Sequence, residues 1–205
     1  MVYCKRTEQL MCCISLSPGK FRPHALERMI PLTKETYLSL LYLISGPLGV
    51  GKSTTAKLLA ERVERCVLIE GDLLLHMLHH ELPLSWDERL SLTWKNLLAL
   101  TRNMLRQGLN VVIDFVVEDE LEWFCEQLSD LDVSIKYAVL HADKEKIAER
   151  LTTRGDIDSL ERSLFLLDKL VSMPQNRQFL YDTALKRPED TAEAILLEPR
   201  FQVLS

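Results

Sequence analysis

The chain has 205 residues, which is enough for one globular domain with a well-buried core. Apolar residues make up 47% and charged residues 27%, a composition typical of water-soluble proteins. The net charge of −5 argues against a surface for polyanions, so we expect no nucleic-acid partner. No apolar run reaches the ~18 residues that span a bilayer, so we expect no membrane partner.

Cysteine usage and the N-terminus both favour a cytoplasmic protein. The apolar run "LMCCISL" is short and no small-residue cleavage site follows it, so secretion is not predicted. The cysteines are odd in number and lack zinc-ligand spacing, which indicates reduced thiols. They are Cys4, Cys12, Cys13, Cys66 and Cys125.

Residues 1–36 carry no sustained periodicity and include the breaker-rich "SPGKFRP". We expect a poorly ordered or peripheral leader there, and we place one domain at residues 37–205. Met29 is an alternative start of translation, which one sequence leaves open.

From residue 37 onward, short apolar runs alternate with longer amphipathic ones. In chain order, we predict strand 37–45, helix 51–63, strand 66–72, helix 73–81, helix 86–107, strand 110–117, helix 118–128, strand 132–142, helix 144–154, helices 158–171 and 174–178, strand 179–183 and helix 187–197. Strands that alternate with helices predict an α/β fold, with a parallel sheet and helices on both faces.

Capping residues support several of these helices. Ser85 precedes helix 86–107 as an N-cap, and Gly108 follows it as a left-handed terminator. Trp86 and Trp94 share the face of this helix that carries its leucines, so core packing is favoured for both. The alternative is that this helix walls a ligand pocket.

A glycine-rich turn lies between the first strand and the first helix. It fits G-x-x-x-x-G-K-[ST] at every position, and a strand before and a helix after are the setting that this motif requires. The residues are Gly46, Pro47, Leu48, Gly49, Val50, Gly51, Lys52 and Ser53, followed by Thr54.

The residue types of this P-loop suit a nucleoside triphosphate, and we expect ATP with Mg²⁺. Glycines let backbone N–H groups surround phosphate oxygens, and the helix N-terminus adds partial positive charge. Lys52 supplies a mobile charge for the outer phosphates, and the Ser53 hydroxyl can ligate Mg²⁺.

Other motifs narrow the class of P-loop protein. The guanine-binding N-K-x-D of GTPases is absent from the sequence. Large ATPases need more chain and an Asp-Glu pair after the third strand, whereas Asp114 is followed here by Phe115. Small-molecule kinases remain, and they fit the length.

Residues 38–198 resemble the P-loop kinase superfamily of shikimate, gluconate and nucleotide kinases. The closest local likeness is to chloramphenicol phosphotransferase-like proteins. The resemblance rests on "GPLGVGKST", on Gly71-Asp72, on "RLTTRGD" (150–156) and on "LYDT…PEDTAEAIL". It implies a five-stranded parallel sheet of order 2-3-1-4-5, and it places the loop 183–188 beside the adenine.

Asp72 ends the predicted strand 66–72, at the edge where open α/β sheets bind ligands, and Asp114 ends the apolar run of the third strand. Asp72 is positioned to orient an acceptor hydroxyl and take its proton, as an acidic residue does in the similar kinases. Its alternative role is an N-cap of helix 73–81, and the two are compatible. Asp114 is expected to hold Mg²⁺ through water, with a capping or turn role as the alternative.

Arg150 and Arg154 lie four residues apart, so we expect both on one helix face. Such a pair can neutralise charge on a transferred phosphoryl group, and by resemblance this is the lid that closes over ATP. The alternative is a solvated face, paired with nearby acids. Arg162 is a third candidate.

His76, His79 and His80 invite a metal site because histidines four apart share a helix face. No third ligand is evident, so surface or pocket-rim histidines are favoured and no metal is predicted there.

These features predict a kinase that moves the γ-phosphate of ATP to a hydroxyl of a small molecule. Lys52, Asp72, Arg150 and Arg154 are the predicted catalytic residues, and residues 73–107 are expected to build the acceptor pocket. The alternatives are a nucleoside or nucleotide kinase and an ATP-binding regulatory module or slow ATPase. We expect a monomer or a homodimer.

Overall fold

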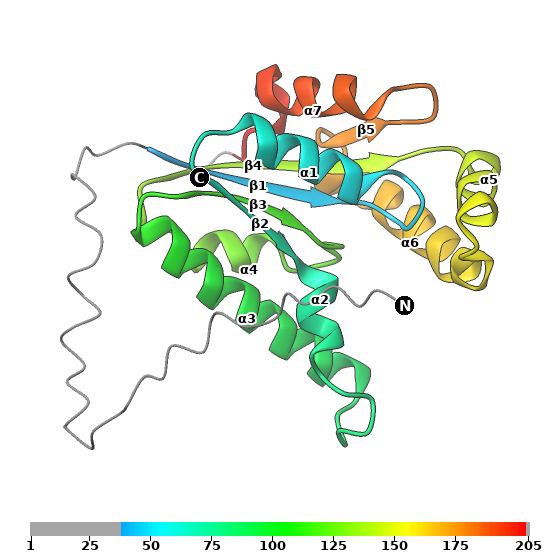
Figure 1. The fold of residues 1–205 in the computed structure, drawn as a ribbon, viewed down its shortest axis with the longest axis horizontal. Helices are drawn as coiled ribbons and strands as arrows, with labels where there is room; N and C mark the ends of the chain where they lie inside the picture. Colours follow the sequence, from blue (N-terminus) through cyan, green and yellow to red (C-terminus); the bar gives the residue numbers. More distant parts are fainter. Residues whose placement is uncertain (1–37, 204–205) are drawn as a thin grey trace, which may run out of the picture. The chain divides into compact units, whose positions relative to one another are not determined.

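The computed structural model describes residues 38–203. Five parallel strands form one sheet of order β2-β3-β1-β4-β5, which confirms the predicted α/β architecture and strand order (Figure 1). The predicted leader and Met29 lie outside the described residues.

The elements follow the predicted order. The strands are β1 (Ser39–Ser45), β2 (Cys66–Glu70), β3 (Asn110–Asp114), β4 (Val133–His141) and β5 (Leu180–Asp182). The helices are α1 (Lys52–Arg62), α2 (Gly71–His76), α3 (Trp86–Arg106), α4 (Leu121–Glu126), α5 (Lys144–Arg154), α6 (Leu160–Ser172) and α7 (Pro188–Leu197). Short 3₁₀ turns are η2 (Ile157–Ser159), η3 (Pro174–Asn176) and η4 (Pro199–Phe201).

The sheet separates two hydrophobic cores because alternate strand residues point to opposite faces. Leu41 and Leu43 of β1 pack with the residues of α3 and α4, while Tyr42 and Ile44 pack with those of α1 and α7. Figure 1 shows these helix pairs on opposite sides of the sheet. A strand with both faces buried explains the continuous apolar run that the sequence shows there.

The chain leaves the sheet after Asp114, three residues earlier than predicted. The Val117 N–H donates to Ser45 Oγ at 2.9 Å, which ties the segment to the end of β1 instead of extending β3. The Glu120 carboxylate accepts hydrogen bonds from the N–H groups of Glu118 and Asp119. Residues 118–120 therefore form a turn before α4, and the prediction that they begin this helix is wrong.

Helix α3 begins as predicted, with a capping box between Ser85 and Glu88. Trp94 is buried, at 3% exposure, but Trp86 is 52% exposed, so the core role predicted for Trp86 is wrong. Eight residues at ~100° each rotate the two side chains by ~80°, which takes Trp86 off the buried face at the first residue of the helix.

Two further findings concern the described residues 38–203. No helix among them is both long enough and apolar enough to span a bilayer.

Cys66 and Cys125 are free thiols, and burial raises the pKa of each to about 11. Thiols with such a pKa are protonated and unreactive at neutral pH.

Substitution of Gly46 tests the packing that the sheet imposes on the turn. A Cβ atom there would lie 2.2 Å from the carbonyl oxygen of Leu140, and φ is +135°. Gly46→Ala should lower the free energy of unfolding by more than ~3 kcal/mol in urea titrations. The matched control is Gly155→Ala, where φ is +82° but the space is open, and it should cost only about 1 kcal/mol. Equal losses would contradict the role of the close approach to β4.

Candidate functional site

The P-loop turn, residues 46–51, joins the carboxyl end of β1 to α1. Gly49 and Gly51 have φ of +82° and +97°, a left-handed backbone that other residues rarely adopt. Gly51 serves as the N-cap of α1 and uses no side chain for this. The glycine positions of the motif are therefore required by the backbone of the turn.

Four consecutive carbonyls of the P-loop turn each lie within hydrogen-bond distance of a side-chain donor. Three of the donors come from distant parts of the chain, and the fourth is Lys52. The pairs are Lys52 Nζ with Pro47 O at 3.1 Å, Ser163 Oγ with Leu48 O at 2.8 Å, Arg150 with Gly49 O at 3.3 Å, and Thr183 Oγ1 with Val50 O at 2.9 Å.

The backbone N–H groups of the turn, unlike its carbonyls, have no hydrogen-bond partner in the described part of the chain. Within residues 38–203, no hydrogen bond occupies the N–H groups of residues 49–53. Donors left open at the N-terminus of a helix form a ready site for phosphate oxygens. The turn therefore suits a polyphosphate, because side chains hold its carbonyls and its N–H groups stay open.

Lys52 is buried beside two acidic groups. Burial lowers the pKa of Lys52, while the charges of Asp114 and Asp72 raise it. Burial also raises the pKa of Asp114, against the opposing effects of Lys52 and a hydrogen bond from Ser53. The structure thus brings together Lys52, Asp72 and Asp114, three of the residues singled out in the sequence.

The Ser53 hydroxyl and the Asp114 carboxylate also fit a magnesium ion. They lie at the end of the P-loop turn and at the end of β3, close enough for the hydrogen bond that lowers the pKa of Asp114. Mg²⁺ in phosphate-transfer sites takes only one or two protein oxygens and completes its shell with water and phosphate. The oxygen donors present therefore suit this ion.

Asp72 is exposed in the first turn of α2, which starts at Gly71, two residues earlier than predicted. The N-cap position belongs to Glu70, and no side chain caps the helix. The alternative role of Asp72 as an N-cap is therefore wrong. Gly71 packs directly against the Phe115 ring, which a Cβ would meet at 2.5 Å, so this first residue of α2 has no room for a side chain.

The two arginines of α5 have different partners. Arg150 donates to backbone oxygens of the P-loop turn and of the loop after β5, including Thr183 O at 2.8 Å. Arg154 is exposed and donates from Nε to Asp156 at 2.5 Å. It lies close enough to Lys52 for its charge to lower the pKa of that lysine. The guanidinium of Arg150 is thus committed to backbone, while that of Arg154 is exposed beside the P-loop.

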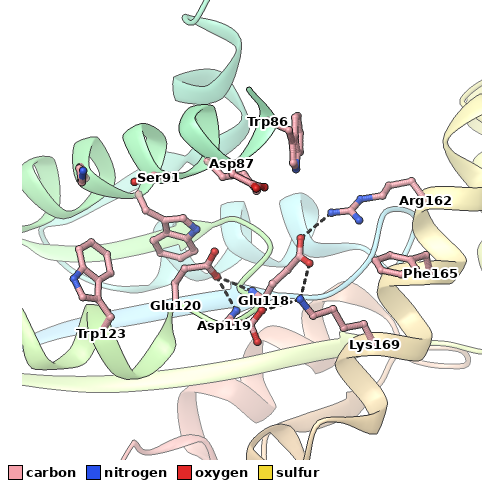
Figure 2. A pocket seen from close by; sticks show the side chains of 13 residues that line it. Trp86, Asp87, Ser91, Glu118, Asp119, Glu120, Trp123, Arg162, Phe165 and Lys169 are labelled. Carbon is pink, nitrogen blue, oxygen red and sulfur yellow. Dashed lines mark hydrogen bonds and ion pairs between the residues drawn. The ribbon is translucent and has the colours of Figure 1, made fainter. Parts of the chain in front are cut away.

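A cavity of about 600 Å³ lies between α3, the turn after β3, and α6, and we call it the α3–α6 cavity. Figure 2 shows its labelled side chains converging from these elements. It is lined by Trp86, Asp87, Leu90, Ser91, Trp94, Lys95, Glu118, Asp119, Glu120, Trp123, Arg162, Phe165 and Lys169. Several lining residues belong to α3, within the predicted acceptor region 73–107, whereas no local pattern in the sequence indicates the turn at 118–120.

Two tethers connect the α3–α6 cavity to the P-loop turn. Ser163, which follows Arg162 in α6, is fully buried and donates to the Leu48 carbonyl. Val117, which precedes Glu118, is bonded to Ser45 immediately before Gly46. The cavity wall and the P-loop turn are therefore held together by buried hydrogen bonds.

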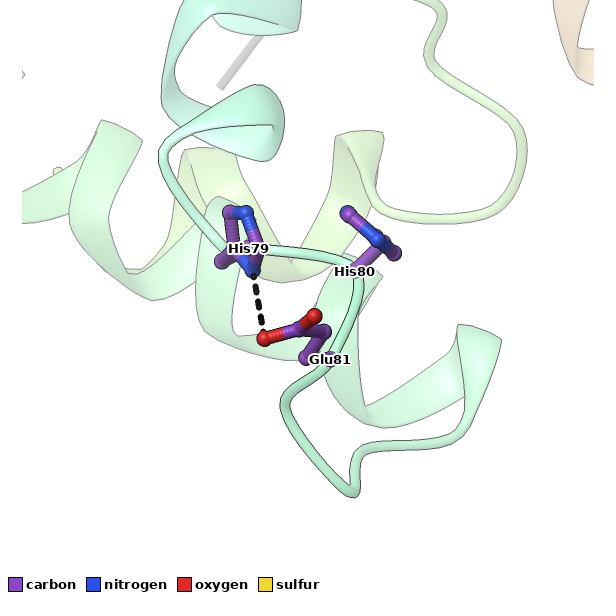
Figure 3. Close-up of side chains that lie close together, drawn as sticks. All are labelled: His79, His80 and Glu81. Atoms are coloured by element: carbon purple, nitrogen blue, oxygen red, sulfur yellow. Dashed lines mark ion pairs between the residues drawn. The ribbon is translucent and has the colours of Figure 1, made fainter.

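His76 ends α2, whereas His79 and His80 lie in the loop between α2 and α3. His79 and His80 lie with Glu81 on an exposed loop, where one ligand atom of each lies within 4.8 Å of the others (Figure 3). Glu81 is the third ligand that the sequence did not suggest. All three side chains are exposed, and such groups commonly lie close without an ion, so we assign no metal to them.

A family model described as an AAA domain (AAA_33) matches residues 41–179, which is more than half of the chain. The chain belongs to this family. No curated protein sequence matches it significantly.

Several solved structures share the fold of this AAA-domain protein. The tunicamycin resistance protein of Deinococcus radiodurans has 24% identity and a TM-score of 0.56, with 77% of this chain and 93% of that chain covered. A gluconokinase from Sinorhizobium meliloti has 20% identity and a TM-score of 0.54, with 78% of this chain and 90% of that chain covered. The Mycobacterium tuberculosis APS kinase, solved with AMPPNP and APS, has 16% identity and a TM-score of 0.59, with 77% of this chain and 95% of that chain covered. At these identities the likeness shows the fold alone.

Arg150 should support the P-loop turn of this AAA-domain protein rather than act on a transferred group. Arg150→Met removes hydrogen bonds to carbonyls of the turn and of the loop after β5, so the free energy of unfolding should fall by about 2 kcal/mol. Arg154→Met removes only the exposed ion pair with Asp156 and should change the free energy of unfolding by less than ~0.5 kcal/mol. Urea titrations of both variants test this, and a larger loss for Arg154→Met would contradict it.

Proposed function

We propose that the protein is an ATP- and Mg²⁺-dependent phosphotransferase that acts on a hydroxyl of a small molecule. One arrangement carries the proposal: open N–H groups of the P-loop turn lie beside buried Lys52, with Asp72 and Asp114 close by. The α3–α6 cavity, tethered to the same turn, offers room for a second substrate. The kinase fold of the solved neighbours supports it.

In this proposal, the P-loop turn and Lys52 bind the β- and γ-phosphates. Loss of the proton from buried Lys52 is disfavoured once phosphate charge lies beside it, which counters the pKa lowering caused by burial. Ser53 and Asp114 would hold Mg²⁺, which supplies charge neutralisation on the β- and γ-phosphate oxygens.

Asp72 is proposed to orient the acceptor. The acceptor oxygen bonds to the γ-phosphorus, the bond from phosphorus to the β–γ bridging oxygen breaks, and ADP leaves. The hydroxyl proton passes to the Asp72 carboxylate, which is exposed in the first turn of α2 and can release it to water. Arg154, exposed and near Lys52, is the arginine that can turn toward charge on the transferred group.

This assignment separates the two arginines that the sequence had paired. Arg150 is proposed as a positioning residue, because its donors already bind the backbone of the P-loop turn and of the loop beyond β5. The loop 183–188 stays the proposed neighbour of adenine. Arg162 lines the α3–α6 cavity.

A regulatory module without an acceptor is the rival from another class. It has no need of Asp72 or of a second cavity beside the triphosphate site, and acceptor-dependent ATP consumption separates the two. A nucleoside kinase differs only in which compound enters the cavity. The cytoplasmic location and the monomeric or dimeric state stay predictions.

Asp72→Asn should lower acceptor-stimulated ATP consumption by about 100-fold or more, because an amide cannot take the proton. Binding of AMPPNP should stay within about twofold, since the N–H groups and Lys52 are unchanged. The measurement is ADP release with panels of sugars, nucleosides and aminoglycoside-like alcohols, alongside calorimetric titration with AMPPNP.

The control is Glu81→Gln, which changes an exposed acid on the following loop and should leave both values unchanged. Full activity in Asp72→Asn would remove Asp72 from the mechanism. A native protein that binds AMPPNP but responds to no acceptor would favour the regulatory module.

A further inference from the structure

The α3–α6 cavity is lined by more acids than bases. Its four carboxylates are Asp87, Glu118, Asp119 and Glu120, and its three cations are Lys95, Arg162 and Lys169. Within residues 38–203, neither Asp87 nor Lys95 forms an ion pair. Lys95 is exposed, so the two α6 cations are the ones whose pairing sets how strongly the inner wall attracts an anion.

Both α6 cations are committed to Glu118 (Figure 2). Arg162 donates to one carboxylate oxygen at 2.7 Å and Lys169 to the other at 3.0 Å. The Glu118 side chain is only 17% exposed, so this pairing is partly shielded from water. Arg162 also lies over the Phe165 ring, 5.2 Å from its centroid. Glu118 thus occupies the donors of Arg162 and Lys169, and among the described lining cations it leaves an anionic ligand only the exposed Lys95.

Lys169 is held further by Asp119, at 2.8 Å. Hydrogen bonds to Asp119 and to Glu118 raise the pKa of Lys169, so it stays protonated. To use Arg162 or Lys169, an anionic ligand would have to draw that cation from its partners and leave the poorly hydrated Glu118 carboxylate with one cation fewer. An uncharged ligand of the same shape meets no such cost.

The remaining lining favours an aromatic ligand. Trp86 and Phe165 are exposed side chains on two different elements, α3 and α6 (Figure 2). Trp94 is buried in the wall, and its Nε1–H has no partner within the described residues. A cavity of about 600 Å³ lies in the range of drug-sized ligands. Aromatic faces and open polar groups together suit a ring system that also carries hydroxyls.

We infer that Glu118 is a specificity-determining residue that makes the α3–α6 cavity select an uncharged, hydroxylated aromatic compound over an anionic one of the same shape. The inference rests on the proposed function only where it takes this cavity as the acceptor site. Binding without ATP tests it independently of phosphate transfer.

The full chain is titrated by calorimetry, without nucleotide, with two probes of matched shape. They are 4-nitrophenyl β-D-glucoside and 4-nitrophenyl β-D-glucuronide, which differ in one hydroxymethyl and one carboxylate. The native protein should bind the glucoside about tenfold more tightly, because only the glucuronide competes for Arg162 and Lys169. Equal affinity, tighter glucuronide binding or no binding of the glucoside at millimolar concentration overturns the inference.

Glu118→Gln should abolish or reverse this preference, since it frees Arg162 and leaves Lys169 with Asp119 alone. Asp119→Asn is the matched control, because Glu118 then still holds both cations and the tenfold preference should persist. Thermal melts establish that each variant is folded. If Glu118→Gln unfolds, Arg162→Gln replaces it: with this cation removed, the glucuronide should not gain affinity. Retention of the native preference in Glu118→Gln overturns the inference, as does its equal loss in both acid variants.

Discussion

The site depends on how the carbonyl groups of the P-loop turn are satisfied. A turn that aims its N–H groups at a ligand must direct its carbonyls elsewhere, and carbonyls buried without donors are costly. Here the donors come from α6, α5 and the end of β5, through Ser163, Arg150 and Thr183. These contacts close a network around the turn before any ligand arrives. Such preorganisation lowers the entropy lost when phosphate binds.

Helix α6 belongs to both halves of the proposed site. Ser163 holds the P-loop turn, while Arg162 and Lys169 on the same helix hold Glu118 across the cavity. A shift of α6 therefore moves the support of the donor site and the wall of the acceptor site together. One helix thus supports both the phosphate-binding turn and the cavity wall.

Expectations based on local patterns agree with the structure where local interactions decide the outcome. The N-cap of Ser85 and the left-handed Gly108 both depend on neighbours within four residues. The strand-turn-helix of the P-loop and the parallel sheet likewise follow from motif and alternation. Expectations fail where a distant contact intervenes. Val117 bonds to Ser45 instead of extending β3, and α2 begins at Gly71, packed against the Phe115 ring.

The sequence by itself determined the α/β class, the phosphate-binding turn and the candidate acids at the strand ends. These follow from periodicity and from residue types that one backbone geometry demands. Only the tertiary structure decided the partners of the charged side chains. Arg150 and Arg154 are four residues apart on one helix, yet the first contacts backbone from two loops and the second an exposed acid. The pairing of Glu118 with α6 joins residues 44 and 51 positions apart, and no local pattern encodes such a contact.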